Sequence, residues 1–150
     1  MIKRGFTLIE LMIVVVIISI LVAIALPKYI DTLDIAYGKR AYDSLQMIYA
    51  AQMRFYNDSG GSFTTNFNSL DVKFPSATFT NNSTLNFGKF QIILSGNTAV
   101  TQNLENYKII FDFENETKQC IVDNNASSVK GARICRALGG EGGPYTFDLR

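Results

Sequence analysis

One acidic residue, Glu10, lies inside the longest apolar run of the chain, which covers residues 6–26. The other polar side chains of this run are Thr7 and Ser19. A carboxylate in hydrocarbon costs several kcal/mol unless it is neutralised or paired with a positive charge. Near the start of a helix, such a side chain can also extend back to the lipid headgroups. The sequence therefore predicts either a charge pair or a headgroup contact for Glu10.

The second pair of reactive side chains is Cys120 and Cys135, which are the two cysteines of the chain. A bridge between them would close a loop of about 15 residues and contribute ~3 kcal/mol in the chain-entropy account of disulfides. If the apolar run spans a membrane with its start inside the cell, both cysteines lie outside the cytoplasm, where disulfides persist. Two unpaired buried thiols are the alternative.

The composition argues against catalysis and against a resident metal. The chain has no His, the commonest general base and a frequent metal ligand, and two Cys are too few for a structural zinc site. The Asp and Glu residues show no spacing that favours a carboxylate pair for glycoside hydrolysis. We therefore expect no enzyme, no catalytic residue, no cofactor and no metal. A formal net charge of +1 gives no electrostatic indication of nucleic-acid binding. DNA stays open as a partner, although the net charge does not indicate it.

The apolar run that holds Glu10 is long enough to cross a bilayer. Its 21 residues would form a helix of ~32 Å, against a hydrocarbon core of ~30 Å. Lys3 and Arg4 stand directly before it, which predicts a cytoplasmic N-terminus and an exported remainder. The small residues of Ala23-Ile24-Ala25 also fit an ordinary secretory cleavage site, but Glu10 would interrupt the apolar region of such a leader.

Beyond Pro27 the helical pattern continues, and we expect one helix over residues 6–57. Apolar residues recur at spacings of three and four along one face, which is typical of an amphipathic helix that packs on a core. These residues are Leu33, Tyr37, Ala41, Leu45, Ile48, Ala51 and Phe55. Pro27 predicts a kink or a loosened turn. Gly38 predicts either a weak point or a close approach of another element.

The rest of the chain predicts an antiparallel sheet and hence an α+β fold. Alternation of apolar and polar residues, with turn residues between the runs, indicates four strands in sequence order. They cover residues 89–94, 98–102, 107–114 and 118–122. We expect residues 62–87 to be a long connecting segment and residues 123–150 to be mostly loop. The four-stranded sheet would pack on the apolar face of the helix.

Residues 5–11, Gly-Phe-Thr-Leu-Ile-Glu-Leu, resemble the processing site and first helical turn of type IV pilins and of their pseudopilin relatives. Pro27 and Tyr29 also stand where many members of that family carry them. The resemblance covers the first 30 residues closely and the remainder in outline. Cys120 and Cys135 lie at positions that resemble those of the two cysteines whose disulfide bounds the C-terminal loop of many pilins.

The resemblance implies a role for each matching residue. A prepilin peptidase would cut between Gly5 and Phe6, which makes residues 1–5 a leader peptide, and would methylate the new amine of Phe6. Glu10 would pair with the Phe6 amine of a neighbouring copy during assembly. Residues 6–26 would then form the transmembrane segment and the filament core, and residues 58–150 the globular head.

Three functions follow as hypotheses. The first is a structural subunit of a type IV pilus, held in the inner membrane and then assembled with other copies of itself, by membrane-bound machinery, into an extracellular filament for adhesion, twitching motility or DNA uptake. A secretion pseudopilin is a close variant. The second hypothesis is a scarce tip subunit that binds a surface or DNA. The third is a solitary single-pass membrane protein with a sensor domain, which predicts no processing at Gly5.

Overall fold

The computed structural model describes residues 6–102, 104, 106–123, 128–143 and 145–149, and it divides the chain into two compact units, Met1–Asp34 and Ile35–Arg150. The first helix, α1 (Leu8–Asp58), contributes to both units and matches the helix predicted over residues 6–57. A 3-10 turn, η1 (Phe67–Ser69), lies in the segment after it. A second helix, α2 (Ser128–Ala137), follows the central strands.

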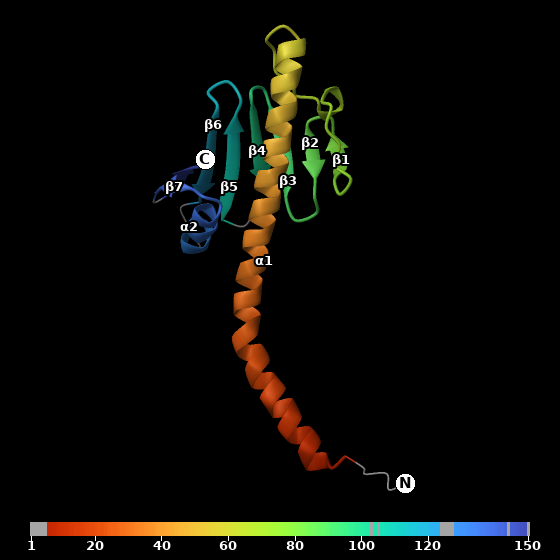
Figure 1. The fold of residues 1–150 in the computed structure, drawn as a ribbon, viewed down its shortest axis with the longest axis vertical. Coiled ribbons are helices and arrows are strands. Elements are labelled where there is room, and N and C mark those ends of the chain that lie inside the picture. Colours follow the sequence, from red (N-terminus) through yellow and green to blue (C-terminus); the bar gives the residue numbers. More distant parts are fainter. Residues whose placement is uncertain (1–5, 103, 105, 124–127, 144, 150) are drawn as a thin grey trace. The chain divides into compact units, whose positions relative to one another are not determined.

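Eight strands of the described residues form one antiparallel sheet in the order β1-β2-β3-β4-β5-β6-β8-β7 (Figure 1). Their bounds are β1 (Thr78–Asn81), β2 (Thr84–Asn86), β3 (Gln91–Ser95), β4 (Thr98–Gln102), β5 (Tyr107–Asp112), β6 (Thr117–Val122), β7 (Glu141–Gly142) and β8 (Thr146–Asp148). The predicted α+β fold is confirmed, and β3 to β6 are the four strands predicted. The sheet is larger than the prediction because β1 and β2 extend one edge and β8 and β7 extend the other.

The interpretation of residues 123–150 as mostly loop was wrong. This region holds α2, β7 and β8, and β8 pairs with β6 through Cys120 and Phe147. The segment 62–87 likewise contains strands β1 and β2. Every residue of β1 is exposed, so this strand shows none of the alternation by which a half-buried strand is recognised in a sequence.

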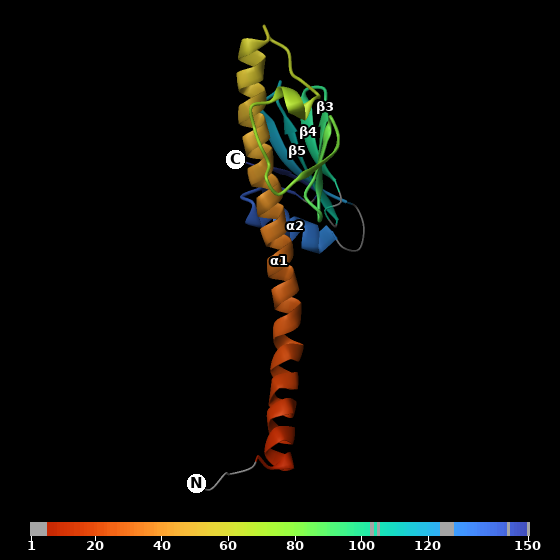
Figure 2. The same cartoon turned by 90° about the vertical axis from the view of Figure 1, so that its right-hand side faces the viewer.

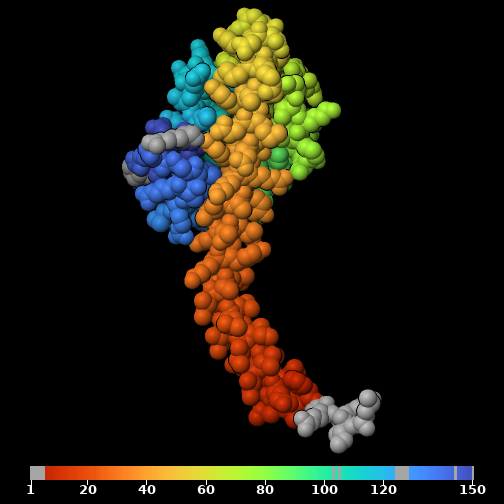
Figure 3. All heavy atoms as spheres, viewed as in Figure 1, coloured from red at the N-terminus to blue at the C-terminus, as the bar shows by residue number. Residues whose placement is uncertain are grey.

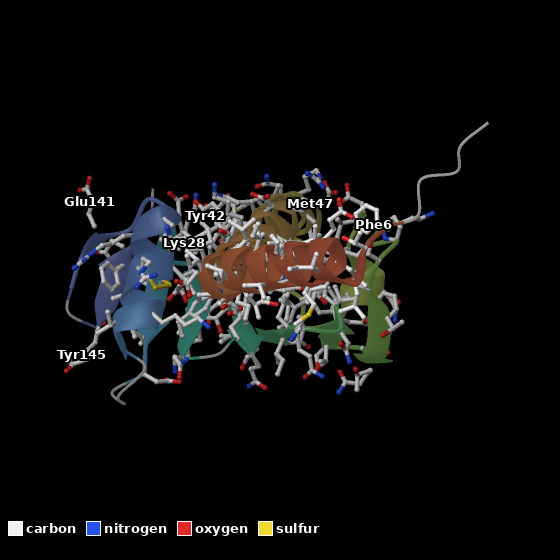
Figure 4. The ribbon with its side chains drawn as sticks, turned by 90° about the horizontal axis from the view of Figure 1, so that it is seen from below. Phe6, Lys28, Tyr42, Met47, Glu141 and Tyr145 are labelled. Carbon is white, nitrogen blue, oxygen red and sulfur yellow. A yellow bond between two sulfur atoms is a disulfide. The ribbon has the colours of Figure 1, made fainter. Side chains whose placement is uncertain are left out.

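The core lies between one face of the sheet and residues 35–58 of α1 (Figure 2). Ala41, Leu45, Ile48 and Ala51, which belong to the predicted apolar stripe, are all buried. They pack against the inward-facing side chains of the strands, in which buried and exposed residues alternate, such as the fully buried Phe111 of β5. The opposite side of this helical segment remains on the surface (Figure 3), and it includes the exposed side chain of Met47, which is labelled in Figure 4. The amphipathic pattern of this segment is thus explained by packing on one sheet face.

Gly38 marks a close approach between α1, α2 and the sheet. A Cβ atom built on this glycine would lie 2.8 Å from the Tyr107 hydroxyl oxygen and 3.0 Å from Cγ2 of Ile134. The space is therefore filled by the neighbouring elements, and of the two sequence interpretations the close approach is correct.

The polar side chain of Gln52, which is fully buried in α1, ties down the segment that follows the helix. Its Nε2 donates to the Thr64 carbonyl at 2.6 Å, and its Oε1 accepts from the Thr64 N–H at 3.2 Å. Nearby, Arg54 and Asp71 form an exposed bidentate ion pair. The hydrogen bond from Arg54 lowers the pKa of the Asp71 carboxyl, so this second tie is lost as the pH falls through that lowered pKa.

Replacing Gln52 with alanine should destabilise the head by about 2 kcal/mol, because both Thr64 backbone groups would lose their partner in a partly buried site. The measurement is thermal unfolding of the full chain in detergent, followed by tyrosine fluorescence. The matched control is Gln46→Ala on the same helix, since Gln46 is only half-buried and its amide donates to the Tyr42 hydroxyl. Equal effects of the two substitutions would contradict the role assigned to Gln52.

Cys120 of β6 and Cys135 of α2 form a disulfide, with their Cα atoms 5.7 Å apart (the yellow bond in Figure 4). Both side chains are fully buried. The bond holds α2 against the sheet, where Gly131 allows the helix backbone to approach within contact of the Asn106 carbonyl. The predicted disulfide is therefore present, and free cysteines are not found.

Candidate functional site

The first turn of α1 is closed by reciprocal hydrogen bonds between Thr7 and Glu10. The Thr7 N–H and the Thr7 hydroxyl donate to Glu10 Oε2 at 2.9 and 2.7 Å, and the Glu10 N–H donates to Thr7 Oγ1 at 3.4 Å. This is a capping box, in which two backbone N–H groups of the helix start gain side-chain partners. The partial positive charge at a helix N-terminus favours the carboxylate further.

Glu10 keeps capacity for one more donor. Both bonds to its carboxylate end on Oε2, and no donor to Oε1 is found among residues 6 to 149 as far as the structure describes them. Glu10 and Phe6 are both exposed, Phe6 to 75%. The arrangement holds the acid in place within a single copy and presents its second oxygen outward, where a cation from another molecule can pair with it.

The surface of α1 that follows this turn is apolar on all sides. Every residue from Phe6 to Ile30 is exposed, and the Ser19 hydroxyl is satisfied by the Val15 carbonyl one turn earlier, at 2.7 Å. Phe6 and Lys28, which bracket the apolar run, are labelled in Figure 4. Of the described helices, α1 is the one that is long and apolar enough to cross a membrane, judged by length and composition. A helix that is apolar all round needs lipid or other protein surfaces around it.

The other predicted site residues lie as follows. Gly5 lies outside the described residues. Pro27 stands inside α1, which continues through it, so the predicted kink stays a prediction. Phe6 directly precedes the capping box, and the pairing of its amine with the Glu10 of another copy is a contact between molecules that a single chain does not test.

Thr7 is the functional residue that our sequence analysis missed. Its signal is present in the sequence, because Thr-x-x-Glu directly before an apolar run is the pattern of a capping box. The charge of Glu10 in an apolar run was the stronger signal, and the hydrogen-bonding capacity of Thr7 three residues earlier was not used.

Comparison with known proteins places this site in a recognised group. Residues 1–26 match the family described as the prokaryotic N-terminal methylation motif. The type IV major pilin protein PilA of Myxococcus xanthus is 49% identical over 56 residues, which cover 37% of this chain and 26% of that protein. The type IV narrow pilus major component PilA5 of Thermus thermophilus is 68% identical over 31 residues, which cover 21% of this chain and 27% of that protein.

A third relative, the fimbrial protein EcpC of Eikenella corrodens, is 44% identical over 59 residues, which cover 39% of each chain. The chain thus spans between about a quarter and two fifths of the length of these curated relatives. No solved structure matches the chain at a significant level.

The capped apolar helix and the matched motif define a class, that of proteins with an N-terminal methylation segment followed by an α+β head. Over the matched residues, the N-terminal segment of the chain is similar to that of type IV major pilins.

Proposed function

We propose that this chain is a structural subunit of a type IV pilus. The precursor is held in the inner membrane with its N-terminus in the cytoplasm, and it polymerises through the apolar part of α1 into an extracellular filament. The observation that carries this proposal is the exposed apolar surface from Phe6 to Ile30, which has an outward carboxylate at its first turn. Because two of the three relatives named above, those of Myxococcus xanthus and Thermus thermophilus, are described as major pilus components, we infer a major subunit.

Processing prepares the chain for assembly. A prepilin peptidase removes residues 1–5 by cutting between Gly5 and Phe6, and the new amine of Phe6 receives a methyl group. The product places a cationic amine four residues before Glu10. Acid and amine therefore stand at the same end of each subunit, at nearly the same depth.

In assembly, the Glu10 carboxylate pairs with the Phe6 ammonium of an adjacent copy. In a medium of low dielectric each of these charges is costly alone, and joining them removes both costs. The contact also sets register, because a shift of one subunit along the other would leave two buried charges unpaired. The apolar side chains gain little by moving from lipid to protein, but only neighbouring copies can cover them once the subunit has left the membrane.

The experiment that tests this proposal is intact-mass spectrometry of filaments sheared from the cell surface. We expect the chain to dominate the sheared material and to have the mass of residues 6–150 with one added methyl group. A chain that retains residues 1–5, or that stays in the membrane fraction, would contradict the proposal. A processed chain found only in traces would identify a tip subunit instead, and one confined to the cell envelope would identify a secretion pseudopilin.

A further inference from the structure

An aromatic pocket with an acidic rim lies where α1 ends beside the turn between β5 and β6. It has a volume of about 440 Å³, and its lining includes Met53, Tyr56, Phe63, Phe113, Glu114 and Glu116. The rings form a continuous series, with Tyr56 and Phe63 centred 4.7 Å apart and Phe63 and Phe113 5.6 Å apart. Tyr56 is exposed to 39%, so the series reaches the surface.

The rim of this pocket is fixed by the turn that carries it. Asp112 Oδ1 accepts hydrogen bonds from the N–H groups of Glu114 and Asn115, both at 3.0 Å. The Asn97 amide of the neighbouring turn donates to Glu114 Oε2 at 2.6 Å. Glu116 has a φ of 54°, a conformation that non-glycine residues seldom adopt. The folded turn therefore sets the backbone positions of both rim residues, and the Asn97 amide also holds the Glu114 carboxylate in place.

Over the described part of the head, the two carboxylates of this rim, those of Glu114 and Glu116, have no ion-pair partner. Lys118, the nearest basic residue along β6, lies over the rings of Tyr49 and Phe111 and does not line the pocket. A cation with an apolar stem would satisfy both the carboxylates and the ring faces.

A surface of the opposite character lies on α2. Val129, Arg133 and Arg136 recur at spacings of four and three, so they share the helix face that points away from the buried Ile134 and Cys135. All three are exposed, Val129 to 70%. With Lys130 included, α2 carries three basic and no acidic residues. An arginine pair beside an exposed apolar side chain matches the chemistry of the pocket.

The two surfaces cannot reach each other within one molecule. The pocket lies at the Asp112 end of β5, whereas α2 packs at the Tyr107 end, beside Asn106 and Val122 (Figure 1). The strand between them has six residues and spans ~20 Å. In a filament of identical, equally oriented copies, each contact joins two different surfaces of the subunit. Complementary surfaces that lie far apart on one copy are suited to such a contact.

We propose that the arginine face of α2, formed by Val129, Arg133 and Arg136, docks into the aromatic–acidic pocket of a second copy of this chain. The contact would join the heads of neighbouring subunits outside the membrane, and it rests on the proposed filament function. The guanidinium groups lie against the rings and pair with Glu114 and Glu116, while Val129 contributes apolar contact.

The test is charge reversal followed by rescue, with the yield of sheared filaments as the readout. Changing Glu114→Arg together with Glu116→Arg should lower the yield at least about tenfold, because like charges would then face each other across the contact. Arg133→Glu with Arg136→Glu should have a similar effect. Combining all four substitutions should restore the yield to within about threefold of wild type, since opposite charges again face each other.

Three controls make the result decisive. Asp43→Arg, a reversal at an exposed position of α1, should leave the yield within about twofold of wild type. Each reversed chain should melt, in detergent, within a few degrees of wild type. If a reversed chain does not fold, the isosteric Glu114→Gln and Glu116→Gln pair replaces it, and it should still lower the yield.

Proximity is measured directly by a variant with Glu116→Cys and Arg133→Cys, which should give a ladder of disulfide-linked multimers in oxidised filaments, whereas either change alone should not. If the wild-type chain forms filaments and both reversed variants assemble equally well, the proposed interface alone is overturned. The same holds if the wild-type chain forms filaments but the combined variant is not rescued and the cysteine variant gives no ladder. Absence of filaments from wild type would instead overturn the proposed function.

Discussion

Glu10→Val should leave the chain processed and membrane-bound but lower the yield of surface filaments at least about a hundredfold. The neighbour's Phe6 ammonium would lose its partner in an apolar core, and an uncompensated charge there costs about 3 kcal/mol or more. Loss of the capping box contributes only about 1 kcal/mol and does not account for an effect of that size. The measurement compares sheared filaments with total processed chain by immunoblot.

The control for this variant is Ser19→Ala, which changes another polar side chain of the same apolar run. Because the Ser19 hydroxyl bonds only to the carbonyl one turn earlier in its own helix, assembly should not change. Normal filaments from Glu10→Val would remove the intermolecular charge pair from the mechanism. A processing defect in that variant would contradict the separation of cleavage from assembly.

Removing the disulfide should destabilise the head more than the Gln52→Ala substitution does. The chain with Cys120→Ala and Cys135→Ala should lose about 3 kcal/mol, because the unfolded chain regains the freedom of a closed loop of about 15 residues. For a unit of this size, the melting temperature should fall by about 10 °C. Tyrosine fluorescence during heating of the full chain in detergent measures the change, since the chain contains seven Tyr and no Trp.

Each single cysteine variant should lose as much as the double variant, because either change opens the same loop. Incubation of the wild-type chain with mild reductant, at temperatures below its unfolding range, should leave its melting temperature unchanged, since both sulfurs are fully buried. Rapid reduction of the native chain would show that α2 opens readily and would contradict its tight packing on the sheet.

Much of this architecture can be predicted from local sequence patterns. The stripe that contains Leu45 and Ile48 predicted the buried face of α1, and the alternation through Ile109 and Phe111 predicted the central strand β5. The N-terminal site was predicted from the conflict between Glu10 and its apolar surroundings. These signals are short-range, because the residues that carry them lie within a few positions of one another.

What sequence reasoning missed depends on distant partners. In α2, Gly131 lowers the helical propensity, and the helix is held by its contact with Asn106 and by the bond from Cys135 to a strand 15 residues earlier. The short strand β8 exists because β6 offers it a partner. Its alternation, in which the buried Phe147 and Leu149 stand on either side of the exposed Asp148, was a usable signal that the adjoining glycine run obscured.

The position of β8 also determines when the head can mature. This strand is made last, yet it lies between β6 and β7, and its Phe147 is fully buried in the common core. The sheet therefore stays open at β6 until translation has passed residue 148. A chain still emerging from the ribosome therefore has an unfinished head, in which the edge of β6 that β8 later covers is unpaired.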